Sequence, residues 1–249
     1  MQLDDLRQNW ETFGAENPMW AIYTGRGRIE WDEGEFFATG DTEISEVMAV
    51  LERHGAPSGA ARALDFGCGL GRLSQALAAH YETVDGVDIS EPMIEGAKAL
   101  ARQPTGVDES RLRYHLNTKA DLSIFEDESF DLVFSLITLQ HMRPEFSRSY
   151  IAEFCRLVRP GGVVFFQLPT HRTTALKRLR GAAGRTMRKV RRSLLGGEPV
   201  MEMYGTPRKD VEALLTTGGL RVLDVLPDEL AGPSWQSFRY LAIRPDSGD

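Results

Sequence analysis

The stretch of sequence that decides the fold is Ala63-Leu64-Asp65-Phe66-Gly67-Cys68-Gly69-Leu70-Gly71-Arg72. It begins as a short apolar strand and ends in a turn with three glycines. Glycine has no Cβ, so the backbone can turn sharply there and approach a ligand closely. In open α/β sheets, ligands bind at the carboxyl ends of the strands. The stretch therefore predicts the first strand of such a sheet and a nucleotide-like ligand at its end.

On both sides of this turn, short apolar segments alternate with helical patterns. The predicted strands are 62–66, 83–87, 111–116, 130–136 and 163–168, and the predicted helices are 71–80, 90–102 and 144–158. Helices between strands require parallel crossovers, which leave a sheet covered on both faces. Right-handed crossovers make it a doubly wound sheet.

The C-terminal part of the chain departs from this alternation. A last helix is predicted over 207–217, followed by strands over 220–226 and 237–243. Only a short segment with no helical pattern separates these two strands, so they are expected to pair antiparallel at the sheet edge. The predicted fold is thus α/β, with a doubly wound, mostly parallel seven-stranded sheet, an antiparallel edge hairpin and helices on both faces.

The spacing of the glycines distinguishes between cofactors. A dinucleotide-binding fingerprint reads G-x-G-x-x-G, because a helix N-terminus must stay open to a pyrophosphate. Here the third glycine of that pattern would fall at position 72, which is Arg72, and the spacing is G-x-G-x-G. Asp88 ends the next strand, where a carboxylate can accept both hydroxyls of a ribose in either class. Together the two features favour S-adenosylmethionine, which has no phosphate.

The sequence resembles the class I (Rossmann-like) S-adenosylmethionine-dependent methyltransferases and is similar to their small-molecule branch. The pieces that carry the resemblance, in the family's order, are 64–71, 86–90, 127–135 and 157–162. The resemblance implies an enzyme that moves a methyl group from S-adenosyl-L-methionine to an oxygen or nitrogen atom of a small molecule, such as a sugar or a natural-product scaffold. It also implies that residues 41–249 form the methyltransferase domain.

The resemblance further implies roles for individual residues. Gly67 and Gly69 would pass under the methionine part of the cofactor, and Asp65 would orient the turn and reach the ammonium through water. The ribose and adenine end would be held by Asp88, Ile89 and the segment 117–122, in which Asp121 is the first choice for the adenine amino group, Asn117 the second, and Leu122 their neighbour. Ser135 would lie beside the sulfur that carries the methyl group.

Residues 1–40 are rich in aromatic side chains and glycines, and are expected to be a helical lead-in and loops. A helix is predicted over 41–54, with Asp41 or Thr42 as its cap. In the resembled family an N-terminal segment often covers the cofactor, so residues 1–40 are expected to form a cap or lid. Tyr23 would then contact the cofactor carboxylate, and Phe36 and Phe37 would pack in the core. Trp235 is expected in the hairpin as a pocket-wall residue.

Methyl transfer from a sulfonium requires alignment of the reactants above all. A base is needed only if the nucleophile holds its proton, and the candidates are His141, His171 and Tyr204. His141 is preferred, because it follows the fourth strand and an unperturbed pKa near 6.5 suits proton transfer at neutral pH. The alternative is a histidine that braces this loop through a backbone hydrogen bond.

The charge of the chain is unevenly distributed. The net charge is −7, yet nine basic residues and no acidic residue lie between positions 171 and 197. The acidic remainder argues against nucleic acid as a partner. A basic helical insertion is expected at 170–205, and three interpretations of 172–192 stay open: it recognises an acidic substrate, docks on an anionic membrane surface, or is a solvated face paired with the acidic body.

Two further function classes compete with methyl transfer. One is an NAD(P)-dependent Rossmann oxidoreductase, against which Arg72 argues. The other is a non-catalytic S-adenosylmethionine-binding protein. The two distant cysteines, Cys68 and Cys155, form neither a disulfide framework nor a metal site. Neither a secretory signal nor an apolar run of the ~18 residues that span a membrane is recognised, so a cytoplasmic location is expected. The sequence does not predict the oligomeric state.

Overall fold

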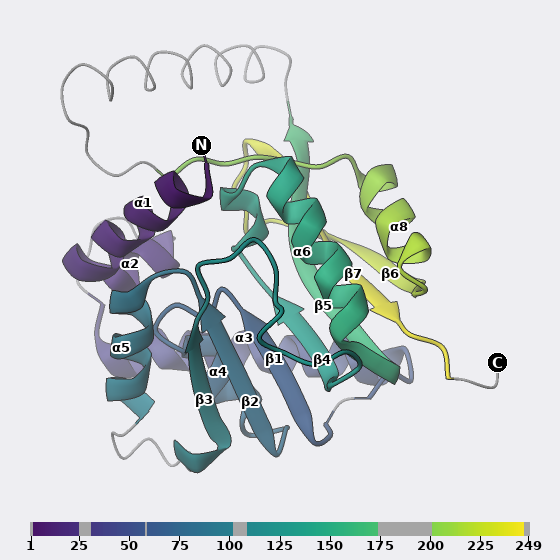
Figure 1. The fold of residues 1–249 in the computed structure, drawn as a ribbon, viewed down its shortest axis with the longest axis horizontal. Coiled ribbons are helices and arrows are strands. Elements are labelled where there is room, and N and C mark those ends of the chain that lie inside the picture. The colour runs from purple at the N-terminus through teal and green to yellow at the C-terminus, as the bar shows by residue number, and fades with distance from the viewer. Residues whose placement is uncertain (1, 25–30, 58, 102–108, 174–200, 247–249) are drawn as a thin grey trace.

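The computed structural model describes residues 2–24, 31–57, 59–101, 109–173 and 201–246, and its central element is a seven-stranded sheet (Figure 1). The strand order is β3-β2-β1-β4-β5-β7-β6. The strands are β1 (Arg62–Phe66), β2 (Thr83–Asp88), β3 (Leu112–Leu116), β4 (Phe130–Ser135), β5 (Val158–Arg172), β6 (Arg221–Asp228) and β7 (Trp235–Ile243). The first five are mutually parallel, and β7 pairs antiparallel with β5 and β6. The predicted fold class is confirmed.

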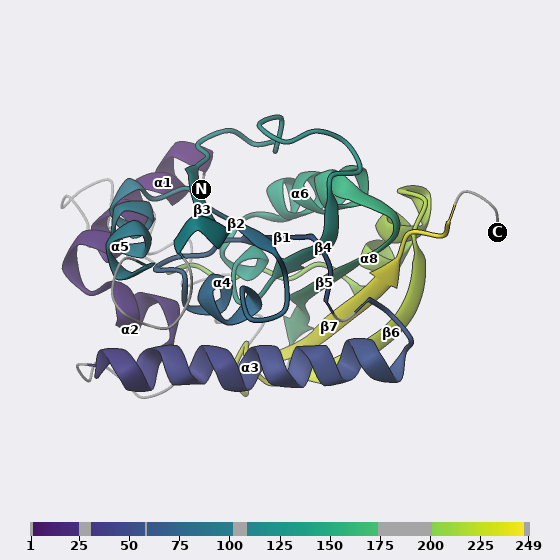
Figure 2. The same ribbon diagram turned by 90° about the horizontal axis from the view of Figure 1, so that it is seen from below.

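Helices cover both faces of the sheet. They are α1 (Leu3–Glu16), α2 (Pro18–Ile22), α3 (Glu33–Arg53), α4 (Arg72–Leu77), α5 (Glu91–Ala101), α6 (Pro144–Leu157) and α8 (Arg208–Thr217), with short 3-10 turns η2 (Glu109–Arg111) and η3 (Leu139–His141). Figure 2 shows α3 running along one side of the sheet with α4 between them, while α6 lies on the opposite side. None of the described helices is long and apolar enough to cross a membrane.

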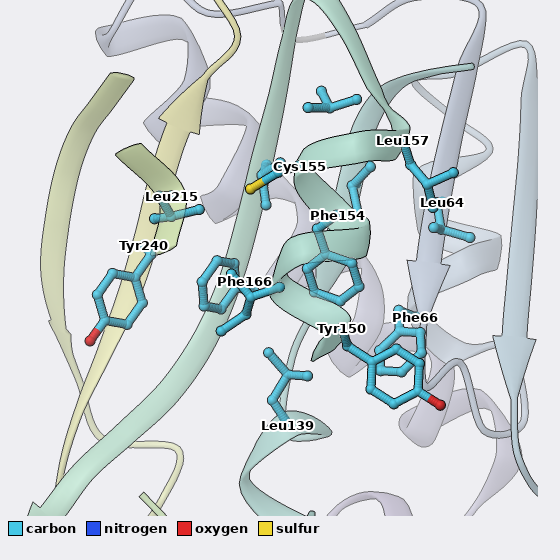
Figure 3. Packing of buried hydrophobic residues seen from close by; sticks show 14 of the residues in the cluster. Leu64, Phe66, Leu139, Tyr150, Phe154, Cys155, Leu157, Phe166, Leu215 and Tyr240 are labelled. Atoms are coloured by element: carbon cyan, nitrogen blue, oxygen red, sulfur yellow. The ribbon is translucent and has the colours of Figure 1, made fainter. Parts of the chain in front are cut away.

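The two faces bury separate apolar cores. On the α6 face, Phe66, Tyr150, Phe154 and Phe166 pack together between the helix and the strands (Figure 3). On the other face, α3 and α4 bury their apolar stripes against β1 and β4. The near-continuous apolar runs of β4 and β5 are explained by this double burial, because both sides of a central parallel strand face a core.

The helical lead-in expected within residues 1–40 is confirmed, and it is more extensive than the sequence indicated. Three helices occupy most of the described part of this segment, and α3 begins at Glu33, well before position 41. Its N-cap is neither Asp41 nor Thr42 but Asp32, whose Oδ1 accepts a hydrogen bond from the Glu35 amide at 3.0 Å. Gly40 looks like a helix breaker in the sequence. It is in fact a close-approach position, since a Cβ there would lie 2.5 Å from the Arg72 carbonyl oxygen.

Two strand boundaries also differ from the predictions. The segment 159–162 lies between a predicted helix and a predicted strand, and in the structure it belongs to β5, which begins where α6 ends and continues to Arg172. Trp235, predicted in the hairpin loop, is the first residue of β7 and packs against the guanidinium of Arg172 at 4.8 Å. Most of the predicted insertion at 170–205 lies outside the described residues, because 174–200 are not described.

Candidate active site

A pocket opens at the carboxyl ends of β1, β2 and β4, beside helix α1. Its empty volume is about 870 Å³, counting the solvent at its mouth. The residues that line it are Leu3, Leu6, Trp10, Ile22, Phe66, Gly67, Cys68, Gly69, Arg72, Leu73, Val87, Asp88, Ile89, Met93, Asn117, Leu136, Ile137, Thr138, His141, Met142 and Tyr150. The position agrees with the expectation for an open α/β sheet.

The glycine turn forms one wall of the pocket in a conformation that glycine alone adopts readily. Gly67, Gly69 and Gly71 have φ angles of 79°, 52° and 80°, in the left-handed region. The Gly67 amide donates to the Val87 carbonyl at 2.7 Å, which ties the turn to β2. A Cβ on Gly67 would lie 2.2 Å from Thr138 Oγ1. The turn is therefore packed tightly between the end of β2 and the segment after β4.

Asp88 joins the ends of β1 and β2. Its Oδ2 accepts from the Gly69 amide at 3.0 Å and its Oδ1 from the Ser90 amide at 2.9 Å. Burial raises the pKa of this carboxyl group, and these amide donors oppose the shift. The carboxylate is thus held in one orientation on the pocket wall, where its remaining lone pairs can accept hydrogen bonds from a ligand.

In the segment after β3, Asp121 was the first choice and Asn117 the second choice to contact the adenine. The structure places Asn117, and not Asp121, on the pocket wall. Asn117 is 5% exposed and lines the pocket. Asp121 is exposed and is absent from the pocket wall, and its Oδ1 accepts from the Ser123 amide at 3.1 Å in a local turn. Hydrogen bonding to Ser123 lowers the pKa of Asp121. The Asn117 side-chain amide donates to the Asp121 carbonyl at 2.7 Å. Asn117 is the pocket-lining residue of this segment, and its contact with a ligand stays a prediction.

Four other predicted residues lie behind or beside the pocket wall. Asp65 is 1% exposed and accepts from Ser74 Oγ at 2.6 Å, and burial raises its pKa to about 6. Ser135 donates to the Phe66 carbonyl, and Leu122 is buried in the core. Tyr23, just after α2, packs its ring against the Arg72 guanidinium at 5.3 Å. Direct cofactor contacts of these residues stay predictions.

His141 lies on the pocket wall at the end of a chain of polar side chains. Its Nδ1 is 2.9 Å from the Glu202 carbonyl oxygen, so Nδ1 carries the proton, and the Gln140 amide donates to Nε2 at 3.1 Å. Gln167 donates in turn to Gln140 Oε1 at 3.2 Å. This network selects one tautomer and orients the ring.

His141 does not keep the unperturbed pKa near 6.5 that made it the preferred base. The side chain is 4% exposed, and burial lowers its pKa to about 4. The imidazole is therefore neutral at pH 7, with Nε2 unprotonated. His171 is exposed, and the Tyr204 hydroxyl donates to Glu202; neither residue lines the pocket.

This lowered pKa gives a testable dependence of stability on pH. Between pH 4 and 6.5 the unfolded chain binds more protons at His141 than the folded chain does, so the stabilisation is complete above pH 6.5 and is lost as the pH falls toward 4. The loss amounts to at most about 3 kcal/mol for one such group. His141→Asn keeps an amide donor near the Glu202 carbonyl and removes the titration.

Urea unfolding of both proteins at pH 7.5 and pH 4.5 measures the effect. Wild type is expected to be more stable than His141→Asn at pH 7.5, and that advantage should shrink at pH 4.5. Asp65 has a raised pKa and contributes with the opposite sign, since its stabilisation is lost as the pH rises through about 6. Asp65 is present in both proteins, so its contribution cancels in the comparison. An advantage equal at both pH values would contradict the lowered pKa.

Helix α1 contributes pocket residues that the sequence reasoning missed. Leu3, Leu6 and Trp10 line the pocket, and the Trp10 carbonyl accepts from Ser90 Oγ at 3.1 Å. The Trp10 ring meets the His141 ring edge-on, with centroids 5.4 Å apart. The spacing of Leu6, Trp10 and Phe13 is helical and was the available signal.

A second missed feature is the backbone at Ile137. This β-branched residue has φ 57°, a conformation that is rare for its type and is concentrated at functional sites. Its amide donates to Gln167 Oε1 at 3.3 Å, which connects it to the His141 network. Sequence alone carries no signal for such strain.

Comparison with known families identifies the central part of the chain. Residues 63–162 match the family model described as a methyltransferase domain. This central part of the chain is similar to a methyltransferase domain. The matched residues include the glycine turn, Asp88, Asn117 and His141, which all line the pocket.

Curated relatives of the methyltransferase domain include several ubiquinone biosynthesis O-methyltransferases. One from Pseudomonas syringae pv. tomato is 38% identical over 137 residues, which are 55% of this chain and 56% of that protein. Another from Coxiella burnetii is 29% identical over 65% of this chain and 64% of that protein. The chain thus spans about half to two thirds of the length of these relatives.

Solved structures share the fold over nearly the whole chain. A magnesium protoporphyrin IX methyltransferase from Synechocystis PCC 6803 with bound SAH is 20% identical, with a TM-score of 0.64 over 96% of this chain and 97% of that chain. The [4+2]-cyclase SpnF is 16% identical, with a TM-score of 0.64 over 97% of each chain. A cyclase among these neighbours shows that the fold alone does not determine the reaction.

Proposed function

We propose that the protein is an S-adenosyl-L-methionine-dependent methyltransferase that acts on an oxygen atom of a small molecule. The observation that carries this proposal is the pocket in which the G-x-G-x-G turn and the Asp88 carboxylate lie side by side, linked by the Gly69–Asp88 hydrogen bond. The match of residues 63–162 to a methyltransferase family and the fold shared with an SAH-bound enzyme support it.

The residues present fit this cofactor. Asp88 would accept the ribose hydroxyls, Ile89 would pack on the adenine, and Asn117 would bond the adenine edge. A Cβ on Gly67 or Gly69 would collide with Thr138 or Ile22, so only glycine lets the turn pack against these residues on the pocket wall. The backbone of the turn would lie under the methionine part of the cofactor. When bound, the cofactor supplies a methyl group that its sulfonium has already activated.

The protein's own contribution is to align the acceptor and to exclude water. Leu3, Leu6, Trp10 and Met142 give the pocket an apolar wall beside His141. An oxygen acceptor is supported by the curated relatives, which are named O-methyltransferases. His141 is the candidate to receive the acceptor's proton, because its Nε2 is unprotonated. A pKa of about 4 makes it a weak base, so alignment should contribute more to the rate than proton transfer.

Turnover tests the proposal directly. The protein and S-adenosylmethionine are incubated with extracts and with hydroxylated or aminated small molecules, and products are searched by mass spectrometry for the gain of one methylene. A product methylated on oxygen is expected, and methylation on nitrogen alone would contradict the oxygen assignment. Slow cofactor loss that does not depend on any acceptor would instead favour a non-catalytic binding protein.

The interpretations of the basic segment, the cytoplasmic location and the lid role of residues 1–40 remain proposals. Contact of 172–192 with an anionic membrane or an acidic substrate rests on residues of which only the first two are described. Sedimentation with anionic and with neutral vesicles separates the membrane interpretation from the others. The N-terminal residues Leu3, Leu6 and Trp10 on the pocket wall support the lid.

A further inference from the structure

Arg72 is the single arginine or lysine among the described residues that line the pocket. It is 3% exposed, although arginine is rarely buried so completely without an ionic partner. Its Nη1 donates to Thr39 Oγ1 at 3.1 Å, and its guanidinium lies 5.3 Å from the Tyr23 ring centroid and 5.9 Å from that of Phe36. Its Nε is buried with no hydrogen-bond partner.

The charge of Arg72 is incompletely compensated within the described structure. Glu43 and Asp65 attract it electrostatically, yet neither forms an ion pair with it in the part of the chain that the structure describes. Burial lowers the pKa of the guanidinium as a result. A buried charge without a paired partner is costly, and the free Nε–H can still donate to an anion.

The neighbours of Arg72 hold its side chain in place. The Thr39 hydroxyl donates to the Phe36 carbonyl at 2.6 Å, so its oxygen is fixed as an acceptor for Nη1. At Gly40 the bare backbone of α3 comes so close that a Cβ would meet Arg72 Cγ at 3.0 Å. The guanidinium is thereby kept near the glycine turn and away from bulk solvent.

We propose that Arg72 binds the carboxylate of the methionine part of the cofactor. This inference rests on the proposed function. Among the described lining residues the ionised side chains are Asp88 and Arg72, and the ligand offers a ribose diol at one end and a carboxylate at the other. Asp88 suits the diol, and a guanidinium whose Nε–H has no hydrogen-bond partner suits the carboxylate. Tyr23 then supports Arg72 as a packing surface and does not itself hold the carboxylate.

Calorimetry with two ligands tests this role. S-adenosylhomocysteine carries the carboxylate, and decarboxylated S-adenosylhomocysteine keeps the ammonium and lacks only that group. Wild type should bind the decarboxylated ligand about 30-fold more weakly, as expected for a charge-assisted hydrogen bond. Arg72→Met should bind S-adenosylhomocysteine about 30-fold more weakly than wild type does, and its affinities for the two ligands should be equal.

Two further variants serve as controls for the effect of losing an arginine and for misfolding of Arg72→Met. Arg208→Met removes an exposed arginine paired with Glu212 and should leave both affinities unchanged. Thr39→Val keeps Arg72 and removes the hydroxyl that accepts its hydrogen bond. Its affinity for S-adenosylhomocysteine should fall a few-fold, while its affinity for the decarboxylated ligand should not change. This variant provides the test if Arg72→Met does not fold. An equal loss for both ligands, in either variant, would overturn the assignment.

The wild-type protein separates this inference from the proposed function. If wild type binds S-adenosylhomocysteine and Arg72→Met still prefers it over the decarboxylated ligand, only the role of Arg72 fails. If wild type binds neither ligand, the cofactor assignment fails, and the role of Arg72 fails with it.

Discussion

Replacing Asp88 with alanine is expected to weaken S-adenosylhomocysteine binding by about 100-fold or more. The bound ribose would lose two charge-assisted hydrogen bonds to the carboxylate, each worth about 1.5–3 kcal/mol. Each tenfold change in affinity corresponds to about 1.4 kcal/mol. The same substitution removes the acceptor for the Gly69 and Ser90 amides. The turn would then lose the support that holds it against β2, which adds to the loss.

Asp121→Ala is the matched control for Asp88→Ala. Both residues were predicted to hold the cofactor, and both accept a hydrogen bond from the amide two residues further on. Asp121 is exposed and away from the pocket wall, so its removal should change the dissociation constant less than about twofold. Calorimetry of the three proteins makes the comparison. Unchanged affinity in Asp88→Ala would contradict the ribose assignment.

Gly67→Ala is expected to destabilise the fold by about 3 kcal/mol or more. A residue with a Cβ at φ 79° costs about 1–2 kcal/mol. The Cβ would also lie 2.2 Å from both Thr138 Cγ2 and Oγ1, and such overpacking costs about 1–3 kcal/mol more. Relief of the collision would have to move the segment after β4, which carries His141, so affinity for S-adenosylhomocysteine should fall as well.

Gly219→Ala separates the two parts of that cost. Gly219 has φ 83°, and a Cβ there meets nothing within 4 Å, so only the backbone cost of about 1–2 kcal/mol remains. Urea unfolding of wild type and both variants measures the difference. Equal destabilisation of Gly67→Ala and Gly219→Ala would show that the glycine turn is not packed against Thr138 as described.

Much of the fold could be predicted from the sequence, because the parallel strands are short apolar runs bounded by turns. The strand 62–66 was predicted with its observed bounds, and the antiparallel edge pair followed from the missing helix between the last two strands. The start of α3 could not be found. Gly34 and Gly40 interrupt its helical pattern, and the reason for Gly40 is a tertiary approach to Arg72.

The site was harder to predict, because residue type does not reveal the direction of a side chain. Asp121 is the acidic residue of the segment 117–122, but its side chain is turned outward, and Asn117 lies on the pocket wall. The low pKa of His141 arises from burial beneath α1, which is distant in sequence, and the hydrogen bond with the Glu202 carbonyl opposes the shift. The glycine turn and Asp88 were predictable, since both lie at strand ends that the apolar pattern defines.

The central claim is that the pocket at the glycine turn is built for S-adenosylmethionine and not for a dinucleotide. Calorimetric titration of the wild-type protein with S-adenosylhomocysteine and, separately, with NADH tests it most directly. S-adenosylhomocysteine is expected to bind at one site per chain, and NADH is expected to show no binding, because the bulky Arg72 occupies the position of the third glycine. Saturable binding of NADH without binding of S-adenosylhomocysteine would contradict the account.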